Sequence, residues 1–348
     1  MIRSLTTALA IVALVAFAGC KKKEEKKKTP KPTPKAGVTK PTPKPAPTAK
    51  ADPALVARGK YLANVLACNL CHTPMGPRGP IMEKAWAGGF RMKEKFGEWV
   101  SPNITPDVKT GIGGWSDAEI IAAVRTGVRK DGTKLKPIMP YPFYSQMTDE
   151  DAKALVTYLR ALKPIENKVE RVELKIPHIP APPAKDYKGK QGEYLATIMH
   201  CAACHVPTDK TGMPDMKRAF AGGMKFELPP QMGTGHLYAP NISSDTKTGI
   251  GKWTVAQIAT SIKAMTRPNG KPIMPPMAMY AAFWSKMTDE DVTAVATFIK
   301  GLPPQVNKVP PSTFKPNAMG PPGGKPPTGK APAKTPPGKD HKPGKSSK

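Results

Sequence analysis

Apolar residues recur at helical spacing in several segments of the middle of the chain, and each segment begins at a residue suited to cap a helix. Asp52 is followed by proline, which is typical of an N-cap and a first helical position. Ser116 and Glu119 form a capping box, as do Thr254 and Gln257. No segment shows a convincing alternation of apolar and polar residues, so the pattern predicts an all-α fold with loops rich in glycine and proline. The last predicted helix of the first half starts at Thr148, carries the apolar stripe Leu155, Tyr158, Leu159 and Leu162, and stops at Pro164, and its counterpart starts at Thr288.

The motifs of the first half return in the same order in the second half. Cys68–His72 recurs as a Cys-x-x-Cys-His motif at Cys201–His205, an offset of 133 residues. The offset grows to 138 at Asn103 and Asn241, and to 140 at Met147 and Met287. Small drifts of this kind correspond to short insertions in one copy, so the sequence predicts a tandem duplication.

The two ends of the chain have a different composition. Residues 1–20 combine Arg3, a 14-residue apolar run and the ending Phe-Ala-Gly-Cys, which predicts a signal peptide with a lipobox and a lipidated Cys20. The alternative is ordinary cleavage with a free Cys20 thiol. Lysine and proline dominate residues 21–50 and 304–348, so we expect a disordered tether and a disordered tail. The predicted domains between them are 51–165 and 186–303, joined by a linker over 166–185.

The net charge of +28 is concentrated in these ends. Residues 21–50 contribute +9 and residues 308–348 contribute +8, which together with Arg3 leaves +10 for residues 51–307. No aromatic residues are interleaved with the basic ones, so the sequence does not indicate nucleic-acid binding. The absence of several long apolar runs also argues against a polytopic membrane protein.

The two Cys-x-x-Cys-His motifs are the candidate chemistry of the chain. Two cysteines at i and i+3 lie on one side of a helical turn, where they can form thioethers with the two vinyl groups of a haem while the adjacent histidine binds the iron. A zinc site would have to pool both pairs across a whole repeat, and a thioredoxin-like dithiol would need a βαβ pattern. The spacing therefore predicts two covalently bound haem c groups, attached at Cys68, Cys71, Cys201 and Cys204 with His72 and His205 as iron ligands.

The sixth iron ligand should come from later in each copy. Met139 lies between prolines in the first copy, where a rigid loop could hold its thioether against the iron; Met147 is expected in the core. The second copy offers Met274, Met277 and Met279. Met277 preserves the offset of 138 and has flanking prolines, whereas Met274 preserves the local letters and Met279 the offset of 140. We choose Met277, with the others open; the rival ligands considered are His178, His200, His236 and His341.

Taken together, these motifs resemble the class I cytochrome c domains of bacterial di-haem cytochromes. The resemblance covers about residues 53–303 and includes Asn103–Asp107, Thr110–Trp115, Met139–Tyr141 and Met147–Asp151. Similar domains form the cytochrome subunits of membrane-bound alcohol and sugar dehydrogenases. The resemblance implies His72 with Met139 and His205 with Met277 as axial pairs. The second copy departs from the pattern at Asn241–Asp245 and in its longer ligand loop.

The sequence and the resemblance predict an electron-transfer protein rather than an enzyme. We expect it in the periplasm or cell envelope, anchored to a membrane by lipid, with one redox protein as donor and another as acceptor. The dehydrogenase subunits often carry three such domains and a membrane helix, so their partner is not carried over, although a role as such a subunit stays open. The alternatives are a di-haem enzyme of the peroxidase or thiosulfate-oxidising type, and a haem sensor or passive envelope lipoprotein. The oligomeric state is left open.

Overall fold

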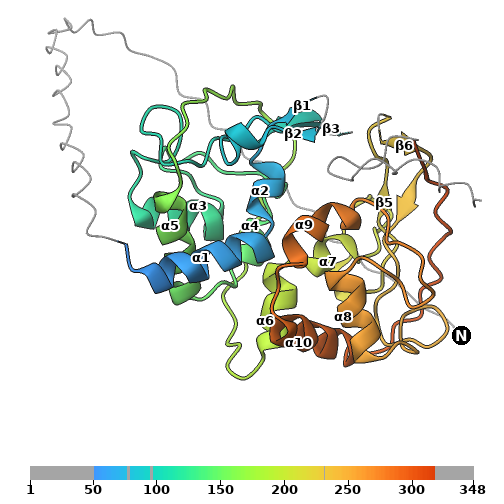
Figure 1. Cartoon of the computed structure of the whole chain (residues 1–348). Coiled ribbons are helices and arrows are strands. Elements are labelled where there is room, and N and C mark those ends of the chain that lie inside the picture. The colour runs from blue at the N-terminus through green and yellow to red at the C-terminus, as the bar shows by residue number, and fades with distance from the viewer. Residues whose placement is uncertain (1–50, 77–78, 95–96, 231, 318–348) are drawn as a thin grey trace, which may run out of the picture. The chain divides into compact units, whose positions relative to one another are not determined.

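The two repeats have the same order of helices. The computed structural model describes residues 51–76, 79–94, 97–230 and 232–317. In each repeat a first helix is followed by one helical turn at the Cys-x-x-Cys motif, a middle helix, a second short turn and a last helix (Figure 1). In the first repeat these are α1 (Pro53–Val65), α2 (Cys68–Cys71), α3 (Asp117–Thr126), α4 (Tyr141–Tyr144) and α5 (Asp149–Ala161). In the second they are α6 (Gln191–Ile198), α7 (Cys201–Cys204), α8 (Val255–Lys263), α9 (Ala281–Trp284) and α10 (Asp289–Lys300).

The helices begin where the capping residues predict. The Asp52 carboxylate accepts a hydrogen bond from the Ala54 amide at 2.9 Å. Capping boxes open α3 at Ser116 and α8 at Thr254, each with both reciprocal bonds present. Thr148 and Thr288 cap α5 and α10 through bonds of 3.1 Å from the backbone amides three residues on. These bonds satisfy amide groups that would otherwise lack partners at the helix starts, so local sequence determines the boundaries.

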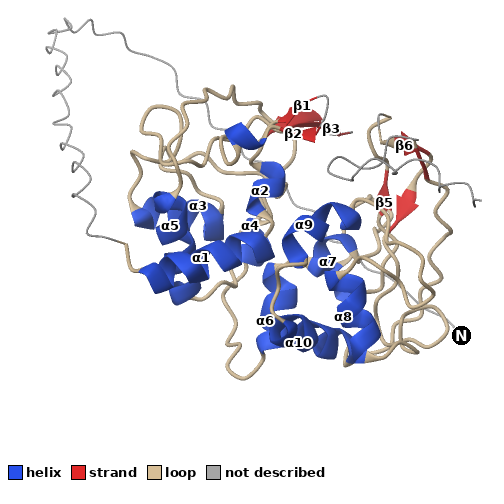
Figure 2. Cartoon of the chain, in the orientation of Figure 1, coloured by secondary structure: helices blue, strands red, loops and turns tan. Residues whose placement is uncertain are grey.

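Short antiparallel ladders lie in the connecting segments (Figure 2). The sequence did not predict them, because ladders of two to four residues are too short to show an alternating pattern, and in Arg91–Glu94 most positions are polar. The fold of the described residues is therefore helical with small hairpins rather than purely α. The pairs are β1 (Met75–Gly76) with β2 (Gly79–Pro80), β3 (Arg91–Glu94) with β4 (Gly97–Val100), β5 (Lys225–Phe226) with β7 (Leu237–Tyr238), and β6 (Gly233–Thr234) with β8 (Lys315–Pro316). Three 3₁₀ turns complete the described elements: η1 (Met82–Lys84), η2 (Met216–Arg218) and η3 (Met277–Tyr280).

Part of the predicted tail makes hydrogen bonds with the second repeat. The Gln305 carbonyl accepts from the side chain of Asn241 at 2.7 Å, and Asn307 donates to the Ala221 carbonyl at 2.9 Å. The pairing of β8 with β6 continues these contacts to residue 316. The bonds involve backbone and amide groups without an apolar pattern, which is why composition alone placed the start of the tail at 304. Residues 1–50 and 318–348, including the predicted lipobox, lie outside the described residues.

The first and last helices of each repeat cross at a glycine. A Cβ atom at Gly59 in α1 would lie 2.0 Å from the Ala154 carbonyl oxygen of α5, and one at Gly192 in α6 would lie 2.0 Å from the Ala294 carbonyl oxygen of α10. Both distances are far below van der Waals contact. The two repeats therefore use the same close helix crossing, and the glycines that matched in the sequence permit it.

We expect Gly59→Ala to destabilise the protein by about 1–3 kcal/mol, because α1 must move away from α5 to admit the methyl group. Chemical denaturation measures the change in the free energy of unfolding. Gly301→Ala is the matched control, since a Cβ there would come no closer than 3.5 Å to its nearest neighbour. Equal stability of Gly59→Ala and wild type would show that the crossing tolerates a side chain.

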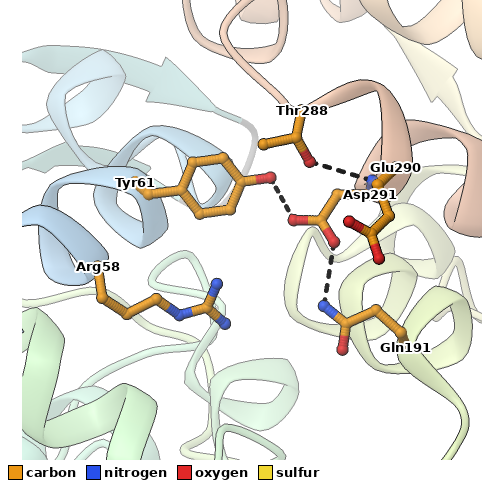
Figure 3. A pocket seen from close by; sticks show the side chains of 6 residues that line it. All are labelled: Arg58, Tyr61, Gln191, Thr288, Glu290 and Asp291. Carbon is orange, nitrogen blue, oxygen red and sulfur yellow. Dashed lines mark hydrogen bonds between the residues drawn. The ribbon is translucent and has the colours of Figure 1, made fainter.

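Reciprocal tyrosine–aspartate contacts join the two repeats. Tyr61 in α1 donates to Asp291 in α10 at 2.5 Å, and Tyr194 in α6 donates to Asp151 in α5 at 2.6 Å. Gln191 also donates to Asp291, at 3.1 Å, as the side chains in Figure 3 show. Burial, together with the bond to Asp291, raises the pKa of Tyr61 to about 12. Each repeat thus supplies one donor and one acceptor to a paired arrangement.

Asp151 has an additional partner. Arg58 donates to its two carboxylate oxygens through two nitrogens, both at 2.8 Å. The Asp151 side chain is only 9% exposed, so this bidentate ion pair is largely shielded from water on the carboxylate side. The equivalent position of the second repeat carries Gln191 instead of arginine, so the two contacts share geometry but differ in charge.

Candidate functional site

Each Cys-x-x-Cys motif forms a single helical turn. α2 and α7 each start after a residue in the left-handed conformation, Ala67 with φ of 52° and His200 with φ of 49°. The four cysteines are free in the structure and partly buried. Cys68 and Cys201 pack against the buried hydrophobic cluster. The i, i+3 spacing places both sulfurs of a pair on one side of the turn, as thioether formation with one haem requires.

The cysteine environments disfavour thiolate chemistry. Burial raises the pKa of Cys68 and Cys201 to about 12 and that of Cys71 and Cys204 to about 11. Thiols with such values stay protonated near neutral pH, whereas redox dithiols and zinc ligands need the thiolate. Within the described ranges, no three His, Cys, Asp or Glu side chains are grouped so as to hold a metal ion. The pooled zinc site considered from the sequence is therefore not formed there.

The histidines after the cysteines are held in one orientation. The His72 Nδ1 atom lies 2.8 Å from the Pro102 carbonyl oxygen, and the His205 Nδ1 atom lies 2.9 Å from the Pro240 carbonyl oxygen. Since a carbonyl only accepts, Nδ1 must carry the proton, which leaves the Nε2 lone pair free for a metal. Burial lowers the pKa of both histidines and so favours the neutral form that binds iron. Both side chains therefore fit the proximal ligand of a haem.

The repeated loop motifs hold these carbonyls in place. The Asn103 side-chain oxygen accepts from the Thr105 amide at 2.9 Å, closing the turn after Pro102. Gly88, with φ of +72°, lies so close to that segment that a Cβ atom would be 2.3 Å from the Pro102 carbonyl carbon. The second repeat keeps this arrangement: Asn241 accepts from the Ser243 amide at 2.9 Å. The departure from the first-repeat motif at Ser243 thus preserves the bond.

Two asparagines that the sequence analysis missed complete this support. Asn167 donates to the Ala87 carbonyl at 2.8 Å, and Asn307 donates to the Ala221 carbonyl at 2.9 Å. Each lies beyond the last helix of its repeat and secures the Gly-Gly loop that packs on the proline. They are 140 residues apart, the offset already set by Met147 and Met287, so the repeat register could have revealed them.

The methionine loop of the first repeat is a short turn before α4. The Met139 amide donates to the Lys136 carbonyl at 3.2 Å, and its side chain is half-buried against the hydrophobic cluster. Met147, by contrast, is fully buried, as expected for a core residue. Met139 is therefore accessible to a haem in a way that Met147 is not, but the assignment as sixth ligand stays a prediction.

The corresponding loop of the second repeat contains two additional residues whose place the structure narrows. The bond from the Ile273 amide to the Met265 carbonyl repeats the bond from Leu135 to Gly127, at an offset of 138. α9 repeats α4 at an offset of 140, so the insertion lies between residues 273 and 281. Backbone register alone leaves Met277 and Met279 as counterparts of Met139. Met274, Met277 and Met279 are all half-buried, and Met277 packs against the hydrophobic cluster as Met139 does.

The rival histidines have other surroundings. His178 lies 3.0 Å from the Tyr141 hydroxyl through Nδ1 and stacks on its ring. His236 lies near Thr313, on the ladder side of the second repeat. His200 is buried, which lowers its pKa to about 4, and its ring contacts two tyrosines. His341 lies outside the described residues.

Comparison with known proteins matches this geometry to one family. The family model for cytochrome c matches residues 56–163 and again residues 189–303, which are the two repeats. The chain belongs to the cytochrome c family. The two matched segments, each with its Cys-x-x-Cys-His motif, correspond to two covalently bound haem c groups, and electron transfer is the function of such cytochrome c domains.

Several curated relatives of this cytochrome are subunits of larger enzymes. The cytochrome c subunit of a quinone-type alcohol dehydrogenase from Gluconacetobacter polyoxogenes is 35% identical over 77% of this chain and 59% of its own length. The fructose dehydrogenase cytochrome subunit of Gluconobacter japonicus is 29% identical over 71% of this chain and 52% of its own length. A diheme c-type cytochrome from Cereibacter sphaeroides is 28% identical over 87% of this chain and 99% of its own length. The chain thus spans little more than half of the two dehydrogenase subunits.

Proposed function

We propose that this cytochrome carries single electrons in the periplasm, taking them from one redox protein and delivering them to another. The observation that carries the proposal is the orientation of His72 and His205, each bonded through Nδ1 to a backbone carbonyl and thus presenting Nε2. Met139 and Met277 are the proposed sixth ligands, with Cys68, Cys71, Cys201 and Cys204 as the attachment residues. Haem iron with two protein axial ligands exchanges one electron at a time and has no open position for a substrate.

The protein groups around each site serve this role. The histidines are only 7% and 8% exposed, which keeps water from the proximal side of each haem. Thioether sulfur is a weak donor that favours the reduced iron, so His/Met ligation raises the reduction potential. The chain's contribution is then orientation, burial and choice of ligand rather than bond-making chemistry.

Carbon monoxide and peroxide distinguish the carrier from a di-haem enzyme. We expect the dithionite-reduced protein to keep its visible spectrum under carbon monoxide, because both sixth positions are filled. We also expect no turnover of peroxide or thiosulfate above a control with the haems alone. Rapid carbon monoxide binding together with substrate turnover would support the enzyme instead.

We further propose that Cys20 anchors the chain to a membrane by lipid. No helix among the described residues is long and apolar enough to cross a membrane. The proposal rests on the Phe-Ala-Gly-Cys ending of the apolar run, and two or more acyl chains would give stable anchoring. Cys20→Ser should move the haem protein from the membrane fraction to the soluble fraction of the cell, with both haems still attached. Retention in the membrane fraction would exclude the lipid anchor.

The names of the relatives favour a dehydrogenase as the electron donor. Three of them are cytochrome subunits of alcohol, fructose or gluconate dehydrogenases. Cross-linking in native membranes, followed by purification of this cytochrome, tests this second proposal. Recovery of a dehydrogenase flavin or quinone subunit would support it, and recovery of other redox proteins alone would contradict it.

A further inference from the structure

Four aromatic side chains connect the segments that carry the two Cys-x-x-Cys turns. We call Tyr144, His200, Tyr280 and Trp284 the junction. The Tyr144 and His200 rings lie edge to face with centroids 6.2 Å apart, and the His200 and Tyr280 rings do so at 5.9 Å. Tyr280 then stacks on Trp284 at 4.5 Å. Tyr144 belongs to the first repeat and the other three to the second, so the stack crosses between the repeats.

The junction is bonded to the segment that leads into α2. The Trp284 indole nitrogen donates to the Val65 carbonyl at 3.0 Å, and the Tyr144 hydroxyl donates to the Leu66 carbonyl at 3.3 Å. These carbonyls lie three and two residues before Cys68. On the other side, His200 is the residue directly before Cys201. The junction therefore touches the chain next to both haem-attachment turns.

Tyr280 lies within electrostatic range of cysteines from both repeats. Burial raises its pKa, and Cys204, Cys71 and Cys201 add to the effect. Burial likewise raises the pKa of Tyr144, with contributions from Cys68, Tyr280 and Cys71. The two attachment turns thus flank the same small group of rings, with α9 contacting α1 of the other repeat.

The reciprocal tyrosine–aspartate contacts hold this arrangement at a second place. Asp291 receives Tyr61 from the first repeat, and Asp151 receives Tyr194 from the second. Two sets of contacts between the repeats, one polar and one aromatic, restrict rotation of one repeat against the other. The spacing of the attachment turns is then a property of the folded chain.

We propose that His200 and Tyr280 are positioning residues for electron exchange between the two haem sites of one chain. The inference rests on the proposed electron-carrier function. One electron leaves the ferrous iron of one repeat, which becomes ferric, and reduces the ferric iron of the other; no bond forms or breaks, no proton moves, and the aromatic rings keep their oxidation state. Close-packed atoms couple two sites better than water or empty space, so the filled junction sets the exchange rate.

The chain offers a well-matched variant for the test. His200→Ala places alanine in the left-handed conformation that Ala67 already adopts at the equivalent position of the first repeat, with φ of 52° against 49°. Tyr280→Leu removes the central ring, and Tyr280→Phe keeps it. Phe298→Leu is the control, because Phe298 packs edge to face on Phe220 within the second repeat and not on the junction.

The experiment is NMR exchange spectroscopy of the half-reduced full-length protein at several concentrations. We expect a concentration-independent exchange rate in wild type, Tyr280→Phe and Phe298→Leu, and a rate at least about tenfold lower in His200→Ala and Tyr280→Leu, equal to about 1.4 kcal/mol of activation free energy. Haem content and the methionine–iron band should be unchanged in all of them. Exchange proportional to protein concentration in wild type, or unaltered exchange in both junction variants, would overturn the inference. Loss of haem or of the methionine–iron band in wild type would instead refute the proposed function.

Discussion

Replacing Cys201 and Cys204 together by alanine is expected to leave a protein with one covalently bound haem in place of two. The two cysteines are the only attachment points that the second repeat offers among its described residues, whereas Cys68 and Cys71 remain intact. Mass spectrometry of the denatured protein measures the loss of one haem, and the pyridine haemochrome spectrum gives the remaining content. The second repeat should also unfold at lower denaturant, because its haem would form part of its core.

The complementary variant and a control make this prediction sharp. Cys68→Ala with Cys71→Ala should lose the other haem, and Cys20→Ala should lose neither. If the first variant kept two haems, the pairing of each haem with one motif would be wrong. If it lost both, the repeats would depend on each other for haem attachment rather than acting as separate sites.

Substituting Met277 by alanine is expected to remove one of two methionine–iron signals while both haems stay attached. Loss of a sixth ligand should lower the potential of that haem by a substantial part of the about 0.8 V that axial ligands control. Near-infrared absorption of the ferric protein and a redox titration measure the two effects. Met139→Ala should do the same for the first repeat.

Two neighbouring methionines serve as controls for this prediction. Met274 precedes the prolines of the loop and Met279 lies in the same 3₁₀ turn as Met277. Neither substitution by alanine should change the methionine–iron signals. A loss caused by Met279→Ala would show that the ligand follows the offset of α9, and a loss caused by Met274→Ala would show that it follows the local motif Lys-Pro-Ile-Met-Pro.

Local sequence predicted the helices well, because helix boundaries depend on nearby residues. Capping boxes and an apolar stripe lie within one element, so Ser116 and Thr254 could be identified without any knowledge of the fold. The hairpins escaped prediction because a ladder such as β5 with β7 has two residues on each strand. The bonds of Gln305 and Asn307 escaped it because their partners lie more than 60 residues away.

The sites were predictable in their covalent part and less so in their supports. Spacing alone indicated Cys68, Cys71 and His72, since thioether attachment needs that spacing. The carbonyl of Pro102 was not predicted, because a backbone acceptor leaves no mark in residue chemistry, although its surrounding motif recurred. The contacts between repeats were missed for another reason: Tyr61 and Tyr194 matched as repeat positions, but their aspartate partners belong to the opposite repeat.

The central claim is that the chain holds two haems with histidine and methionine ligands and exchanges single electrons. Spectroelectrochemical titration of the full-length protein, followed in the visible and the near-infrared, tests it most directly. The account predicts two reversible one-electron steps and a ferric methionine–iron band with the intensity of two sites. A single step, or a ferric spectrum of high-spin iron without that band, would contradict it.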